Sequence, residues 1–131
     1  MTYKDNHRKV YIIDGENFDS LESFYEEVSR VLIPGACWGK NLDAFNDILR
    51  GGFGTPDDGF IIRWKSSEIS RQKLGYDETV RQLERRLSTC HSSNRKYVRK
   101  DLEMAKIGKA PTVFDWIIEI VNVHASGGDE S

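Results

Sequence analysis

Two short apolar runs with helical patterns between them constrain the fold of this chain most strongly. Residues 9–14 are mostly apolar and partly β-branched, and residues 60–64 form a second run of the same kind. Between them, segment 20–32 carries apolar residues at helical spacing, with Ser20 as a suitable N-cap. Strands joined through helices pair in parallel through a right-handed crossover. We therefore expect an α/β fold with a small parallel sheet of two or three strands, in which 9–14 is a buried strand.

The segment 42–50 has two opposite faces. A helix advances by about 100° per residue, which places the apolar residues on one side and Asp43 and Asp47 on the other. Asn41 is a suitable N-cap, and Gly51 is a suitable end. Asp43 gains roughly 0.3–1 kcal/mol from the helix dipole, whereas Asp47 lies beyond its reach and repels Asp43 by roughly 0.2–0.5 kcal/mol. An acidic pair with so little local benefit suggests a cationic partner; the alternative is an ordinary solvated helix face.

The second half of the chain is expected to be mainly helical. Helical patterns cover four segments: 66–73, 76–89, 95–106 and 112–123. We expect a helix at 112–123, although the β-branched residues of this segment are also compatible with a strand. A turn is expected at 55–59 and a disordered tail at 126–131. These features predict a single domain over residues 1–125, in which 76–125 forms a helical extension.

The composition argues against several classes of protein. A chain of 131 residues fits one domain with a substantial core. It has no apolar run of 18 residues and no apolar signal core at its N-terminus, so a cytoplasmic location without a membrane span is expected. The two cysteines, Cys37 and Cys90, do not make a disulfide framework. Cys90-His91 alone provides too few ligands for zinc, and no second pair with the spacing of a metal site accompanies it. Neither a metal nor a cofactor is expected.

The charges are unevenly distributed. Residues 14–47 hold eight acidic and two basic side chains, net −6, whereas residues 60–110 hold thirteen basic and six acidic ones, net +7. The acidic half suits electrostatic attraction of a basic partner. The basic half suits either nucleic acid or a plain solvated helical surface.

Residues 38–47 carry the most specific pattern. They read Trp38-Gly39-Lys40-Asn41-Leu42-Asp43-Ala44, followed by Asp47. This order resembles the signature of the barstar family of ribonuclease inhibitors, which has an aromatic residue, Gly, any residue, Asn-Leu-Asp-Ala and a second Asp four residues after the first. The flanking strands and helices also resemble that family, so the resemblance covers about residues 9–75.

The resemblance implies a fold, a function and a binding surface. It implies a barstar-like inhibitor that blocks a basic ribonuclease or toxin nuclease by inserting an acidic helix and the loop before it. Asp47 is then expected to replace a substrate phosphate, and Asp43 to contact an adjacent cation. The candidate partner-binding residues are Cys37, Trp38, Gly39, Asn41, Asp43, Asn46 and Asp47.

Three residues of this set also have expected structural roles. Trp38 is expected to anchor the loop in the core rather than contact the partner directly. Gly39 is expected to allow either a positive-φ turn or a close backbone approach. Asn41 is expected to act first as the helix cap.

Departures from the family pattern bear on the identity of the target. Cys37 stands where the family's binding loop has an aromatic residue, and Asn46 stands where it has a tryptophan. The acidic contact residue on the family's fourth helix has no counterpart that the sequence identifies. We therefore expect a partner other than the family's well-known nuclease, or weaker binding to it.

Other functions receive less support. No histidine, nucleophile elbow or phosphate loop accompanies the two aspartates, so an enzyme is not expected. A nucleic-acid-associated module using the basic region 80–109 is one alternative, in which exposed arginines and lysines bind phosphates around Tyr97. An immunity protein for a toxin that is not a ribonuclease is another. A pI near 5.9 counts against nucleic-acid binding.

Overall fold

The structure is a computed structural model that describes residues 9–51 and 59–124. Positions 55–58 of the predicted turn and the predicted tail at 126–131 lie outside these ranges. The elements in chain order are β1 (Lys9–Asp14), η1 (Gly15–Asn17), α2 (Leu21–Leu32), α3 (Leu42–Arg50), β2 (Phe60–Lys65), α4 (Ser67–Lys73), α5 (Tyr76–Thr89), η2 (Ser92–Asn94), α6 (Arg95–Lys106) and α7 (Val113–His124), where η marks a short 3-10 turn. None of the helices within the described ranges is long and apolar enough to cross a membrane.

The described part of the chain has one two-stranded sheet. Strands β1 and β2 pair in parallel from Lys9 opposite Phe60 to Asp14 opposite Lys65. This confirms the parallel pair that the sequence predicts. Only one face of β1 is buried, because its side chains alternate in exposure along the strand. The expected burial of this strand thus holds for one face, which carries Tyr11 and Ile13, whereas Val10 and Ile12 are exposed.

The C-terminal apolar segment forms helix α7. Its start has the reciprocal bonds of a capping box: Asp115 N–H donates to Thr112 Oγ1 at 3.2 Å, and Thr112 N–H donates to Asp115 Oδ2 at 2.9 Å. Helix is thus the correct one of the two alternatives that the sequence left open. Because α7 packs against α3, it helps to hold the helix that carries the candidate site.

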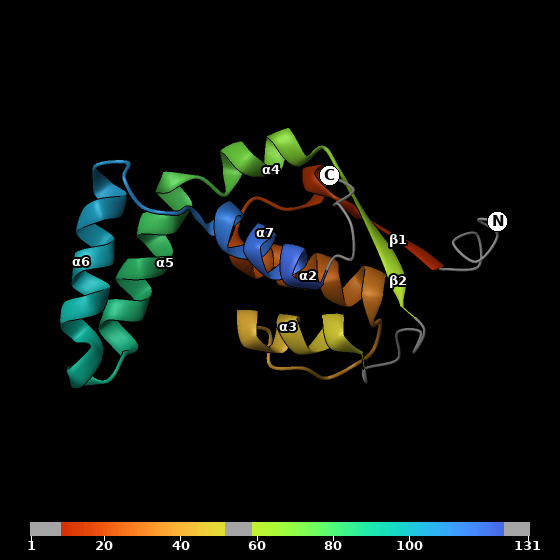
Figure 1. The fold of residues 1–131 in the computed structure, drawn as a ribbon, viewed down its shortest axis with the longest axis horizontal. Helices are drawn as coiled ribbons and strands as arrows, with labels where there is room; N and C mark the ends of the chain where they lie inside the picture. The colour runs from red at the N-terminus through yellow and green to blue at the C-terminus, as the bar shows by residue number, and fades with distance from the viewer. Residues whose placement is uncertain (1–8, 52–58, 125–131) are drawn as a thin grey trace.

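Aromatic side chains join the helices to the sheet. Trp64 of β2 stacks on Phe24 of α2 with ring centroids 5.7 Å apart. Phe24 also meets Phe45 of α3 edge-on at 5.3 Å, and Trp64 meets Phe114 of α7 at 5.6 Å. One main core therefore fixes α2, α3 and α7 relative to the sheet (Figure 1).

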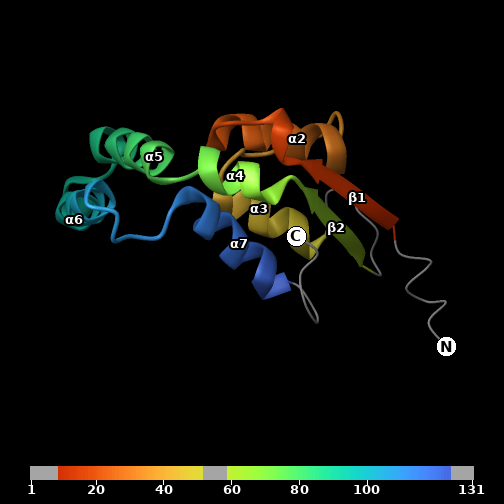
Figure 2. The same cartoon turned by 90° about the horizontal axis from the view of Figure 1, so that it is seen from above.

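Helices α5 and α6 form a hairpin at the end of the molecule opposite the sheet, as two perpendicular views show (Figures 1 and 2). The hairpin has a small core of its own, formed by Leu83, Val98, Leu102 and Ala105. Trp116 of α7 packs against both this core and the main one. The hydroxyl of Thr79 in α5 accepts a hydrogen bond from the backbone N–H of Val113 at 2.8 Å. Helix α7 thereby connects the hairpin to the main body.

Candidate partner-binding site

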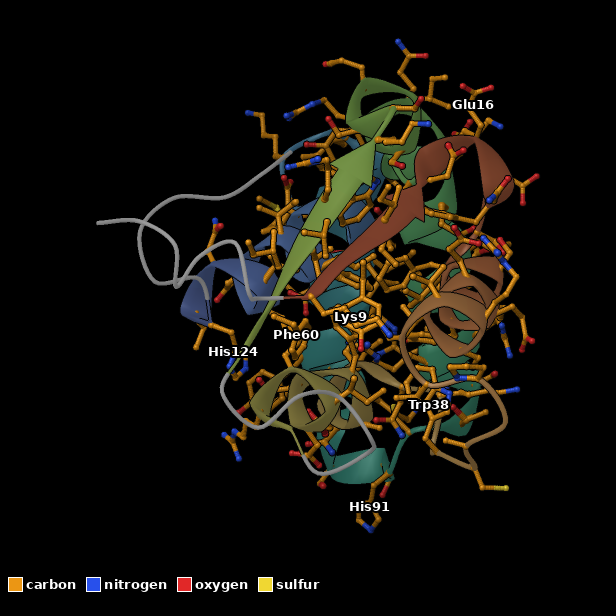
Figure 3. All side chains as sticks on the ribbon, turned by 90° about the vertical axis from the view of Figure 1, so that its right-hand side faces the viewer. Lys9, Glu16, Trp38, Phe60, His91 and His124 are labelled. Atoms are coloured by element: carbon orange, nitrogen blue, oxygen red, sulfur yellow. The ribbon has the colours of Figure 1, made fainter. Side chains whose placement is uncertain are left out.

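The loop between α2 and α3 is held against α2 by Trp38. The indole N–H of Trp38 donates a hydrogen bond to Ser29 Oγ at 2.7 Å, and its ring meets Tyr25 edge-on with centroids 5.7 Å apart. Trp38 packs against the main core, as Figure 3 shows from the side of the sheet. Its predicted role as the loop anchor is confirmed. The neighbouring Cys37 is an exposed free thiol.

Just before α3, the residue with a left-handed backbone is Lys40 and not Gly39. Lys40 has φ of 51°, whereas Gly39 is not among the residues with positive φ. The predicted positive φ at Gly39 is therefore wrong. The alternative fits, because a Cβ at Gly39 would lie 3.0 Å from the side-chain nitrogen of Asn41. Glu26 holds the Lys40 ammonium at 3.0 Å, which offsets part of the roughly 1–2 kcal/mol that a left-handed non-glycine residue costs.

Helix α3 presents both aspartates to solvent. Asn41 caps it, since its side-chain oxygen accepts a hydrogen bond from the backbone N–H three residues on, at 2.7 Å. Phe45 and Ile48 are buried in the main core, with 2% and 0% of their surface exposed. Asp43 and Asp47 are exposed on the face that points away from this core. The cap and the two opposite faces predicted from the sequence are confirmed.

The charges on Asp43 and Asp47 are only weakly compensated within the protein. Arg50 lies 3.8 Å from Asp47, but both side chains are more than half exposed, so the pair is worth about 0–1 kcal/mol. Asp43 forms no ion pair with any residue of the described ranges. Both carboxylates are therefore accessible to a cationic partner.

Asn46 lies on a different side of α3 from the two aspartates. It is half-buried, and its side-chain oxygen hydrogen-bonds His124 at the end of α7. Figure 3 shows His124 beside α3. The structure thus gives Asn46 a role in joining two helices, and its side chain is less available to a partner than the sequence pattern suggested.

A groove of about 690 Å³ runs beside Asp43. Its walls come from α2, from the start of α3 with the preceding loop, and from α5. Six charged side chains line it: Glu22, Glu26, Lys40, Asp43, Arg85 and Arg86. The site therefore combines an acidic helix with a groove that contains both signs of charge.

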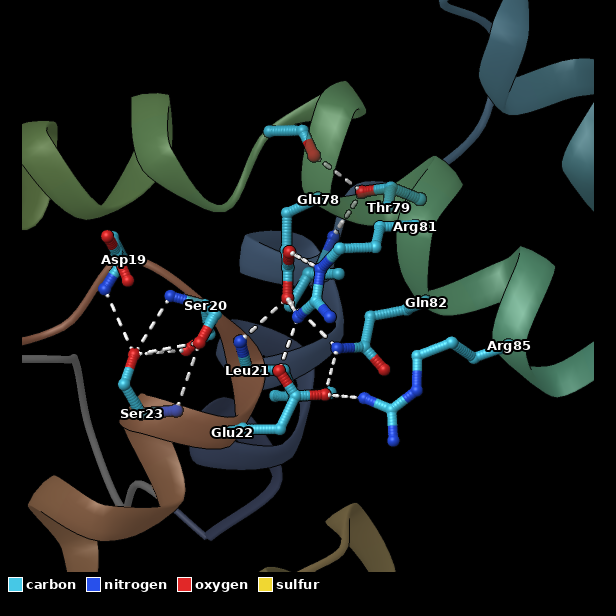
Figure 4. A network of polar contacts seen from close by, with 12 residues as sticks. Asp19, Ser20, Leu21, Glu22, Ser23, Glu78, Thr79, Arg81, Gln82 and Arg85 are labelled. Carbon is cyan, nitrogen blue, oxygen red and sulfur yellow. Dashed lines mark hydrogen bonds and ion pairs between the residues drawn. The ribbon is translucent and has the colours of Figure 1, made fainter.

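Glu78 fastens α5 to the start of α2 near this groove. Its buried carboxylate accepts hydrogen bonds from the backbone N–H of Leu21 at 2.8 Å, from Arg81 Nε at 2.7 Å and from Gln82 Nε2 at 2.9 Å. Figure 4 shows this arrangement. Burial alone would raise the pKa of Glu78, but the hydrogen bonds outweigh it and lower the pKa. The carboxylate is thus held ionised at the junction of two helices.

Glu22 adds a second acceptor to the same junction. It accepts a hydrogen bond from Gln82 at 2.7 Å and forms ion pairs with Arg81 and Arg85. Burial would raise its pKa, but the hydrogen bonds from Gln82 and Arg81 lower the pKa to about 2. One wall of the groove is therefore built from a polar network that spans α2 and α5 (Figure 4).

The contribution of α5 to this surface was missed by the sequence analysis, which assigned Arg85 and Arg86 to the basic region 80–109. The relevant signal is a polar stripe on α5 at helical spacing, which comprises Glu78, Gln82, Arg85 and Thr89. Three of these four residues line the groove. The stripe shows that this face of α5 is polar, but its contact with α2 depends on tertiary packing.

Comparison with known proteins identifies the family of the chain. The family model described as Barstar (barnase inhibitor) matches residues 8–106. The match thus runs past the 9–75 recognised from motifs, takes in α5 and α6, and stops before α7. No curated protein matches the chain significantly. Since the family match covers most of the sequence and the α/β fold agrees with it, this chain belongs to the barstar family.

Proposed function

We propose that this protein inhibits a small basic ribonuclease by covering the nuclease active site with the loop 37–41 and α3. The family description, barnase inhibitor, supports the inhibitory role. The observation that carries the specific proposal is the exposure of Asp43 and Asp47 on one face of α3, while Phe45 and Ile48 fix the helix from behind.

The chemistry follows from what a ribonuclease must bind. Its active site holds a phosphate group with cationic side chains, so a carboxylate in the same place satisfies those cations without offering a cleavable bond. Asp47 takes that place, and Asp43 binds a cation next to it. Because α3 is capped and packed before the partner arrives, little conformational entropy is lost on binding.

Location and domain organisation belong to the same proposal. An inhibitor that protects the cell making the nuclease acts in the cytoplasm, before the nuclease is secreted. We treat residues 1–125 as one unit, because α7 contacts both α3 and α5 and so links the hairpin to the main core. The negative segment 14–47 attracts a basic partner from a distance.

An inhibition assay tests the proposal. The purified full chain is titrated into a panel of small secreted microbial ribonucleases, barnase among them, with a short fluorogenic RNA as substrate. Inhibition of at least one member at a one-to-one ratio, relieved by excess substrate, is the expected result. Absence of inhibition across the panel would contradict the proposal.

The basic face of α6 favours a second candidate, binding of nucleic acid. Tyr97 is 61% exposed and lies under the Lys96 ammonium at 5.1 Å. Nearby, Arg95, Arg99 and Lys100 form no ion pairs within the described ranges. In the same assay, a protein that sequesters RNA lowers the rate with every ribonuclease equally and loses its effect at moderate salt. A direct inhibitor discriminates between the nucleases.

A further inference from the structure

In the groove beside Asp43, one charged side chain of each sign has no ion-pair partner among the described residues. Three acidic and three basic side chains line the groove. Four of them form ion pairs within the protein: Lys40 with Glu26, and Arg85 with Glu22. Asp43 and Arg86 form no ion pair with any residue that the structure describes. Both line the groove, from α3 and from α5. The groove therefore presents one carboxylate and one guanidinium that are available to charged groups of a partner.

Tyr25 lines the same groove as these two charges. Burial is the main reason that its pKa is raised; the Glu22 carboxylate and, to a smaller extent, the Asp43 carboxylate raise the pKa further, and the Arg86 guanidinium opposes them. Its ring is buried, with 8% of the residue exposed, and its hydroxyl makes no hydrogen bond within the described part of the chain. The groove lining thus also includes a hydroxyl that has no hydrogen-bond partner among residues 9–51 and 59–124.

The Arg86 guanidinium is held in place. It lies over the ring of Trp116 in α7, 5.3 Å from the ring centroid. A cation stacked on an aromatic ring has a restricted position, which lowers the entropy lost when it binds an anion. Arg86 is therefore suited to recognise a partner group at a defined place.

Resting on the proposed function, we infer that the nuclease bound by this protein places a cation on Asp43 and an acidic side chain on Arg86, side by side in this groove. Docking of α3 on a partner removes water from the groove, and a charge that loses water without gaining a partner weakens the complex. A nuclease surface carrying only cations here would leave Arg86 repelled and Asp43 alone satisfied. The groove thus selects among basic nucleases by the acidic residue that accompanies their cation.

The direction in which one charge reversal changes the inhibition constant distinguishes these two kinds of partner. The probe is the ribonuclease that the parent protein inhibits in the panel above, and the readout is the inhibition constant. If the partner offers an acid to Arg86, then Arg86→Glu places two acids together and weakens inhibition by about tenfold or more. If the partner is purely cationic there, the same change strengthens inhibition, which would overturn the inference.

Two further variants separate local from general effects. Arg63→Glu on β2 changes the net charge equally at an exposed position outside the groove, and is expected to stay within about threefold of the parent. Arg86→Lys keeps the charge but loses the planar group that stacks on Trp116, so it is expected to weaken inhibition less than Arg86→Glu does. Equal weakening by Arg86→Glu and Arg63→Glu would overturn the inference, as would parent-like inhibition by Arg86→Glu. Failure of the parent to inhibit any nuclease would instead overturn the proposed function, and the inference with it.

Discussion

The carboxylate of Glu78 accepts a hydrogen bond from the backbone N–H of Leu21, 57 residues earlier in the chain, at 2.8 Å. Leu21 is the first residue of α2, where backbone N–H groups have no partner within the helix. A negative charge at a helix start is also favoured by the helix dipole. One side chain of α5 therefore completes the start of α2 and joins two of the helices that line the groove beside Asp43.

Replacing Glu78 tests this junction. Glu78→Ala leaves the Leu21 N–H without its acceptor and the Arg81 guanidinium with Glu22 alone, so we expect the unfolding free energy to fall by about 1–3 kcal/mol. Urea denaturation at pH 7 measures it. Glu84→Ala, an exposed position on the same helix, serves as the control and is expected to change stability by less than about 0.5 kcal/mol. Equal effects of the two variants would show that Glu78 has no special structural role.

The same junction predicts a loss of stability in acid. The pKa of Glu22 is lowered from 4.5 to about 2 in the folded protein, and the pKa of Glu78 is also lowered. Because these pKa values lie below their unfolded values, the stabilisation is complete above about pH 4.5 and is lost as pH falls toward 2.

Urea midpoints measured from pH 6 down to pH 2.5 test this dependence. We expect the parent to lose stability over the acid part of that range, and Glu78→Gln, which has no proton to bind at this site, to lose less of it. A parent and a variant with superimposable pH profiles would contradict the assignment of the acid sensitivity to this junction.

The left-handed conformation of Lys40 makes a prediction about the binding loop. Lys40→Gly and Lys40→Ala both lose the ion pair with Glu26, so their difference isolates the backbone. We expect the glycine variant to be more stable by about 1 kcal/mol, because only glycine adopts positive φ without a steric cost. Thermal or urea denaturation of the pair measures this difference. A more stable alanine variant would place the strain elsewhere.

Local features of the fold were predictable because they depend on neighbouring residues. The period of the apolar residues in α3 is set by helix geometry, and its cap at Asn41 depends on a hydrogen bond within the first turn. The parallel pairing of β1 and β2 follows from the helices between them. These elements therefore agree with the sequence-based expectations.

Other features depend on packing between distant segments. The sequence left open a positive φ or a close approach at Gly39, and the positive φ lies instead at Lys40, where Glu26 of α2 holds the side chain. The sequence indicated Asn46 as a candidate partner-binding residue, but its side chain hydrogen-bonds His124 of α7. The groove depends on α5 meeting α2 through Glu78, and no local pattern specifies that contact.

The inhibition constant of the Asp43→Ala/Asp47→Ala double variant tests the central claim most directly. Its matched control is Glu103→Ala/Glu119→Ala, which removes two exposed carboxylates on α6 and α7 and changes the net charge equally. With the ribonuclease that the parent inhibits, we expect the aspartate variant to lose about 2 kcal/mol or more of binding free energy, roughly thirtyfold, because nuclease cations are left unpaired. The control is expected to stay within about threefold of the parent. Inhibition by the aspartate variant as strong as that by the parent would contradict the assignment of α3 as the inhibitory surface.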